Sequence, residues 1–114
     1  MIASPTTEHI SCNGILRPRE DALVPIWNQA LFYSFGVYES IEVDAGVTFH
    51  LDDHIERLFH SAAIIELPMR YDRETIRRWV QELIAEDRIQ EALLRIIVLG
   101  PNGEESADDT LVYI

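Results

Sequence analysis

Two arginines in this sequence sit where a positive charge is unexpected, and both could bind an anion. Arg57 lies about 200° around a predicted helix from the apolar stripe that faces the core. Arg95 interrupts a run of aliphatic residues, Ala-Leu-Leu-Arg-Ile-Ile-Val-Leu, that is typical of a buried strand. The planar guanidinium of arginine matches the paired oxygens of carboxylates and phosphates.

Each arginine also has a purely structural explanation. Arg57 on the outer face of a helix could simply be a solvated arginine, or its face could look into a cleft that holds an anion. Arg95 must be paired or reach water or a ligand, because a buried unpaired guanidinium costs several kcal/mol. We therefore expect either an ion pair with Glu39, another charged residue on an apolar strand face, or contact with a substrate carboxylate.

Lysine is absent from this sequence, in which all nine basic residues other than histidine are arginine. Chemistry that requires a lysine amine, such as a Schiff base, is therefore impossible within the chain. His50 and His54 are four residues apart, but His50 is predicted on a strand, so the two would not share a helix face. We expect no metal site there, and the single cysteine, Cys12, excludes an internal disulfide.

The composition describes one acidic globular domain. The 114 residues are 47% hydrophobic, and the net charge of −11 argues against nucleic acid as a partner. No apolar run is long enough to cross a membrane, and no basic start followed by an apolar stretch marks a signal peptide. These features favour a cytoplasmic protein without a membrane or nucleic-acid partner.

Local patterns predict the elements that would carry these residues. Asn13-Gly14 between two short apolar runs favours the tight turn of a β-hairpin. The first half is then predicted to contain loops at 17–25 and 27–35 and strands at 36–43 and 47–51. The second half is predicted to contain two helices. The first is capped by Asp53 together with Glu56 and ends by Pro68, and the second is capped by Asp72. They are followed by a strand at 93–99, an acidic loop at 104–109 and a last strand at 110–114.

The predicted order is therefore two pairs of strands, two helices and two further strands. This order is typical of an α+β fold: a two-layer domain in which hairpins form an antiparallel sheet and two helices cover one face. The chain stops within its last predicted strand, without a polar tail. We therefore expect a single domain, residues 1–114, with more protein downstream.

Several segments resemble the small N-terminal domain of the class IV aminotransferases, a family that includes branched-chain and D-amino acid aminotransferases and aminodeoxychorismate lyase. Residues 30–41, ALFYSFGVYESI, are similar to the stretch that opens that domain. Residues 49–62 are similar to the family's F-x-L-x-x-H-x-x-R-L-x-x-S-A segment. The Asn13-Gly14 turn and the strand bearing Arg95 also fall where the family has them, so the resemblance covers nearly the whole chain.

The resemblance implies roles that the residues alone do not establish. Arg57 matches the arginine that grips the phosphate of the cofactor, pyridoxal 5'-phosphate. Tyr38 matches an aromatic residue of the substrate pocket, whereas alone it reads as a packing residue. Tyr33 and Arg95 match, in the branched-chain type, residues that meet the substrate carboxylate. The family also implies a homodimer, amino acid and 2-oxo acid substrates, and a catalytic lysine in a larger C-terminal domain that this chain lacks.

Two departures from the family pattern blur the substrate. Many members have Gly-Asp-Gly where this chain has Ser34-Phe35-Gly36, and the branched-chain type often has tyrosine where this chain has Leu93. We therefore expect the small domain of an aminotransferase, inactive alone. The alternatives are an aminodeoxychorismate lyase-like domain, a non-catalytic dimerising or anion-binding module, and an unrelated α+β interaction domain with a Glu39–Arg95 pair.

Overall fold

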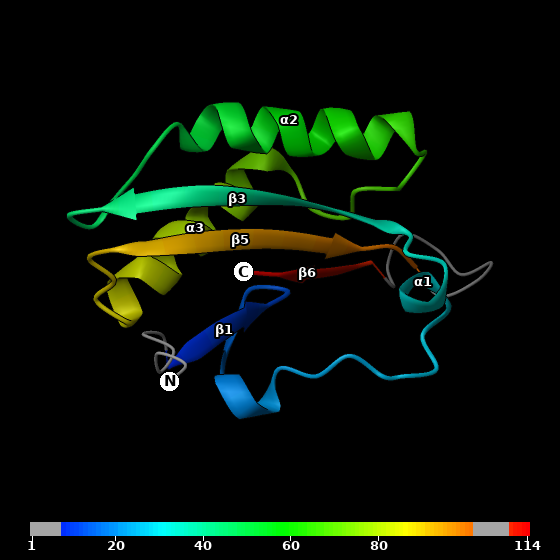
Figure 1. Ribbon diagram of the computed structural model, residues 1–114, viewed down its shortest axis with the longest axis horizontal. Coiled ribbons are helices and arrows are strands. Elements are labelled where there is room, and N and C mark those ends of the chain that lie inside the picture. Colours follow the sequence, from blue (N-terminus) through cyan, green and yellow to red (C-terminus); the bar gives the residue numbers. More distant parts are fainter. Residues whose placement is uncertain (1–7, 102–109) are drawn as a thin grey trace, which may run out of the picture.

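A computed structural model describes residues 8–101 and 110–114, and its six strands form one antiparallel sheet in the order β2-β1-β6-β5-β3-β4. The elements are β1 (His9–Cys12), β2 (Ile15–Pro18), the short 3-10 helix η1 (Arg19–Asp21), α1 (Gln29–Phe32), β3 (Gly36–Asp44), β4 (Val47–Thr48), α2 (Leu51–Ile64), α3 (Arg73–Glu86), β5 (Ala92–Leu99) and β6 (Leu111–Tyr113). Helices α2 and α3 lie on the same face of the sheet (Figure 1). The predicted two-layer α+β fold is confirmed.

The core lies between that face and the two helices. Along β5, Leu94, Ile96 and Val98 are buried, while Leu93, Arg95 and Ile97 are exposed. This alternation arises because successive side chains of a strand point to opposite faces. The buried side chains that the helices contribute include Ile55 and Leu58 of α2 and Ile76, Val80 and Leu83 of α3. The opposite face of the sheet carries no long helix among the described residues.

The hairpin prediction is confirmed, and its turn touches the helical layer. Asn13 and Gly14 both have positive φ, at 49° and 84°, between β1 and β2. A Cβ atom on Gly14 would lie 2.4 Å from the indole ring of Trp79 on α3. Glycine is therefore required here for its backbone conformation and for the close approach of the helix.

Residues 27–35 were predicted as loop, and this prediction is partly wrong. They contain the one-turn helix α1, which begins after Asn28, whose side chain accepts a hydrogen bond from the backbone N–H of Leu31 at 3.1 Å. A single turn is too short to show a helical repeat in the sequence. The predicted loop at 17–25 likewise begins later, because β2 continues to Pro18 and η1 follows.

The start of α2 was also predicted wrongly. The strand expected at 47–51 is only the two residues of β4, and α2 begins at Leu51, with His50 as its N-cap in a left-handed conformation. Asp53 therefore lies inside the first turn and does not cap the helix. Beginning at Leu51 extends the buried stripe of Ile55 and Leu58 by one more apolar side chain, which favours the longer helix.

The remaining predictions agree with the structure where it describes them. Asp72 caps α3 by accepting a hydrogen bond from the backbone N–H of Thr75 at 2.8 Å. Strands β5 and β6 lie within a residue or two of their predicted bounds, whereas the loop expected at 104–109 lies outside the described residues. Helix α2 ends at Ile64, before Pro68. None of the helices in the described part of the chain has the length and hydrophobicity that a bilayer-spanning segment needs.

A buried carboxylate at the end of α3 fastens β1 to the helical layer. The side chain of Asp87 is 1% exposed, and one oxygen accepts hydrogen bonds from the backbone N–H groups of Glu8 and His9, both at 2.9 Å. Its other oxygen lies 2.6 Å from Nδ1 of the His9 ring. Burial raises the pKa of the Asp87 carboxyl, but these hydrogen bonds outweigh it and the pKa lies below its ordinary value, while the hydrogen bond to Asp87 raises the pKa of His9.

This pair predicts a pH dependence of folding stability. The Asp87 contribution is present above the ordinary carboxyl pKa of about 4 and is lost as pH falls through the lower folded value. The His9 contribution is present below the ordinary imidazole pKa of about 6.5 and is lost as pH rises through the higher folded value. We expect urea unfolding to show a decline in stability as pH rises above the ordinary imidazole pKa of about 6.5. The variant His9→Gln should lose that decline; parallel pH curves for the two proteins would contradict the assignment.

Candidate functional site

Strand register decides which of the candidate side chains can meet. In the antiparallel pair of β3 and β5, Ser40 lies opposite Arg95 and Glu39 lies opposite Ile96. Directly opposed residues share a face of the sheet. Glu39 therefore faces the helices with Ile96, and Arg95 points from the other face. The predicted ion pair between Glu39 and Arg95 is wrong because the two side chains leave the sheet in opposite directions.

The partner of Glu39 is Arg57. The Nε atom of Arg57 donates to both carboxylate oxygens of Glu39 at 3.0 Å, and Nη2 lies 2.8 Å from one of them. The Nδ1 atom of His54 lies 2.8 Å from the same oxygen. Helix α2 brings these groups to Glu39 because His54 and Arg57 are three residues apart, on one side of the helix.

In this cluster the Glu39 carboxylate is buried, the Arg57 guanidinium is exposed, and their contacts shift the pKa of both groups. Glu39 is 6% exposed, whereas the side chain of Arg57 is 67% exposed. Burial alone raises the pKa of Glu39, but the hydrogen bonds from Arg57 and His54 outweigh it and the pKa lies below its ordinary value. The hydrogen bond to Glu39 raises the pKa of Arg57. The cluster therefore holds a carboxylate inside the fold and a guanidinium that meets solvent on its other edge.

Arg95 and Tyr38 lie on the far face of the sheet and line the same hollow. This hollow has a volume of about 440 Å³ and is bounded by β3, β5 and the end of α1; its lining consists of Leu31, Ser34, Gly36, Val37, Tyr38, Arg95, Ile97, Val98 and Leu99. The side chain of Arg95 forms no ion pair or hydrogen bond with the residues that the structure describes. The structure thus places a cation that has no charged partner among the described residues in a largely apolar hollow.

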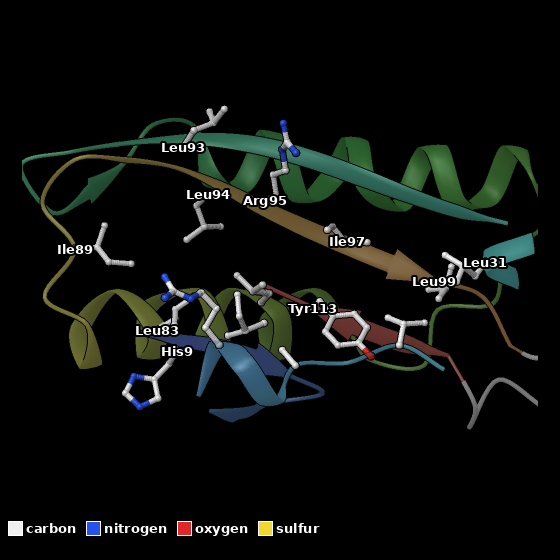
Figure 2. Close-up of a pocket in the computed structure, with 15 residues that line it drawn as sticks. His9, Leu31, Leu83, Ile89, Leu93, Leu94, Arg95, Ile97, Leu99 and Tyr113 are labelled. Carbon is white, nitrogen blue, oxygen red and sulfur yellow. The ribbon is translucent and has the colours of Figure 1, made fainter. Parts of the chain in front are cut away.

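A larger hollow, of about 630 Å³, lies on the other side of Arg95 (Figure 2). It occupies a gap in the sheet, because β6 pairs with β5 only from Ile97 to Leu99, and within the described residues the first half of β5 has no second neighbour. Its lining includes core side chains such as Leu83 and Leu94. Arg95 and Leu94 leave β5 on opposite sides (Figure 2), so this hollow is lined both by core side chains and by the exposed side chains Leu93 and Arg95, and Arg95 lines both hollows.

Arg57 lies on one face of the sheet, and Tyr38 and Arg95 lie on the other. Strand β4 pairs only with Val43 and Asp44, so the part of β3 before Glu42 has no neighbour on that side among the described residues. Arg57 lines neither hollow, and Tyr33, at the end of α1, is 81% exposed and does not line the smaller hollow. The structure brings together Arg95 and Tyr38 but not Tyr33.

The sequence matches a known enzyme family over most of its length. A family model described as "Amino-transferase class IV" matches residues 36–114. The chain belongs to the class IV aminotransferases. Among its relatives, a D-alanine aminotransferase of Listeria monocytogenes is 39% identical over 77 residues, which are 68% of this chain and 27% of that protein. A putative branched-chain-amino-acid aminotransferase of Methanocaldococcus jannaschii is 30% identical over 99 residues, 87% of this chain and 34% of that protein.

Solved structures of class IV aminotransferases share the fold. The branched-chain aminotransferase of the thermophilic archaeon Thermoproteus uzoniensis, solved with norvaline, matches with a TM-score of 0.81 at 25% identity, over 95% of this chain and 40% of that one. The chain thus spans about a quarter to two fifths of the length of these relatives. The segment that matches the family contains Arg57, Tyr38 and Arg95, whereas Tyr33 precedes it.

Sequence reasoning missed the partners of Arg57. His54 was considered only as a possible metal ligand, and Glu39 was considered only as a possible partner of Arg95. The i, i+3 spacing of His54 and Arg57 was a usable signal, since such residues share one side of a helix. The described residues contain one group of three potential metal ligands, Glu8, His9 and Asp87, which is the structural cluster at the end of α3.

Proposed function

We propose that this chain is the small domain of a pyridoxal-phosphate-dependent aminotransferase that moves an amino group from an amino acid to a 2-oxo acid. The observation that carries the proposal is the pair of guanidinium groups, Arg57 on the helical face of the sheet and Arg95 on the opposite face. Each keeps N–H donors free for an anion, and both lie within the segment that matches the family. A cofactor phosphate and a substrate carboxylate are the two anions that such a reaction requires.

The residues present fit pyridoxal phosphate as a partial site. Arg57 would bind its phosphate, because an exposed guanidinium edge suits phosphate oxygens. The bound cofactor would supply the electron sink for bond breaking at the α-carbon. The amine that holds the cofactor would come from polypeptide outside this sequence, since the chain has no lysine.

Arg95 would hold and orient the substrate carboxylate. Its guanidinium lies between Leu93 and Ile97 along β5, with Tyr38 lining the same hollow. A carboxylate fixed there places the rest of the substrate against apolar side chains, which favours amino acids with apolar side groups. Leu93, which stands in place of the tyrosine common in the branched-chain type, lines the larger hollow on the other side of Arg95. We assign Tyr33 to the same carboxylate only through the family resemblance.

A homodimer is part of the proposal. The segment between η1 and β3 exposes large apolar side chains, namely Leu23, Ile26, Trp27, Phe32 and Tyr33. Contiguous exposed apolar side chains are typical of protein interfaces. A second subunit covering this segment would bring Tyr33 into a buried environment, from which it could reach a substrate.

Chemical trapping tests whether this chain by itself can form a Schiff base with the cofactor. The 114-residue chain incubated with pyridoxal phosphate and borohydride should show by peptide mass spectrometry no stoichiometric adduct at an internal residue, because no lysine amine is available. Only the N-terminal amine should react. The chain with cofactor, an amino acid and a 2-oxo acid should not transaminate. An internal adduct, or turnover by this chain alone, would overturn the proposed role.

A further inference from the structure

We propose that Glu39 is a positioning residue for anion binding, which orients the Arg57 guanidinium and leaves its outer edge free for a phosphate. This inference rests on the phosphate role of Arg57 under the proposed function. It gives a role to Glu39, a buried acid that lies beside Arg57, the cation proposed to bind the phosphate. Such a placement is unexpected, because a carboxylate next to the guanidinium reduces its attraction for a phosphate.

The contacts show which edge of the guanidinium Glu39 occupies. Nε and Nη2 form one edge of the planar group, and both contact the Glu39 carboxylate at 2.8–3.0 Å. The N–H groups of Nη1 and the second N–H of Nη2 form the other edge. That edge belongs to a side chain that is 67% exposed, so the unused donors face outward. Paired parallel donors are the arrangement that binds two phosphate oxygens at once.

Glu39 itself is held firmly enough to serve as a reference point. Its backbone lies in the middle of β3, in register with Ile96 of β5, and its side chain is buried under α2. His54 provides a second hydrogen bond at 2.8 Å, so the carboxylate has partners on two sides. Neither a shift of the strand nor a change of rotamer can move Glu39 without breaking these contacts.

Fixing Arg57 in advance lowers the cost of binding. An exposed arginine samples many rotamers, and part of that freedom is lost when it binds a ligand. Hydrogen bonds to Glu39 remove that freedom before the phosphate arrives, so less is lost on binding. If pre-organisation dominates, loss of the Glu39 charge should weaken phosphate binding. If charge dominates, the same loss should strengthen phosphate binding. The sign of the change in phosphate affinity therefore distinguishes the two effects.

The test is a titration of this chain with inorganic phosphate, followed by the NMR signals of the arginine Nε–H groups. In the wild type, the Arg57 Nε–H signal should be sharp and protected, and the Nη signals should shift with phosphate. The variant Glu39→Gln places an amide N–H against the donors of Arg57. We expect the phosphate Kd to rise about tenfold and the protected signal to be lost. An unchanged or lower Kd, as charge alone predicts, would overturn the inference.

Two further variants separate the possible failures. If Glu39→Gln does not fold, the variant His54→Ala takes its place, because it removes one hydrogen bond to the Glu39 carboxylate at a half-buried site. We expect it to raise the phosphate Kd roughly threefold. An unchanged Kd would overturn the inference. Arg57→Ala should abolish the phosphate response. If phosphate binding in the wild type is absent or survives Arg57→Ala, the proposed phosphate role itself fails. If Arg57→Ala abolishes binding and Glu39→Gln does not weaken it, only the role of Glu39 fails.

Discussion

Replacing Arg57 by alanine in the complete aminotransferase should weaken pyridoxal phosphate binding by roughly 10- to 150-fold. The estimate follows from the loss of hydrogen bonds to a charged group, which contribute about 1.5–3 kcal/mol in total. The measurement is the equilibrium affinity of the apoenzyme for the cofactor, from its absorbance or from dialysis. Arg57→Lys should give an intermediate affinity, because lysine keeps the charge and loses the planar fork.

Arg57→Ala also removes the main partner of the buried Glu39 carboxylate, so a control must separate the effect on stability from the effect on cofactor affinity. Glu39 is buried and would keep only His54 as a side-chain partner, so the variant should also be less stable to urea. Arg78→Ala is a matched surface control on α3, because Arg78 is exposed and pairs only loosely with Glu82, at 3.6 Å. It should leave cofactor affinity and stability unchanged. Loss of stability in Arg57→Ala without a change in cofactor affinity would contradict the phosphate role.

Replacing Arg95 by leucine should reduce kcat/KM for amino acid substrates by about 100-fold, because the substrate carboxylate would lose a charged partner in an apolar hollow. The variant should fold at least as well as the wild type. The Arg95 side chain has no partner among the described residues, and leucine is compatible with its neighbours Leu93 and Ile97 on the same strand face. Steady-state kinetics together with urea unfolding measure both effects.

A substrate without a carboxylate provides the control for Arg95. An amine of the same side-chain shape cannot use the guanidinium, so its kcat/KM should be similar in the wild type and in Arg95→Leu. The loss should therefore be specific to amino acids. An equal loss for both substrates would show that Arg95 acts on the structure of the site, and would contradict its role in binding the carboxylate.

The sequence alone was sufficient for much of this protein. The two-layer fold was indicated by the hydrophobic periods of the two long helices and of β3 and β5, and by the turn at Asn13-Gly14. The family was indicated by the motif around Arg57. These features could be recognised because local periodicity and turn formation depend on residues close together in the sequence. The absence of lysine is equally a property of the sequence. Short elements were missed: α1 has too few residues for a repeat, and the start of α2 depended on the burial of Leu51.

Only the tertiary structure decided which charges meet. Glu39 and Arg95 both looked like charges on buried strands, and the sequence offered no reason to prefer another pairing. The register of β3 against β5 places them on opposite faces, and the packing of α2 on β3 brings Arg57 to Glu39 instead. A shift of the register by one residue would exchange the faces, and the sequence of either strand alone does not fix that alignment. Long-range pairing thus determined that Arg95 has no ion-pair partner in the part of the chain that the structure describes and that Arg57 is held in place by an acid.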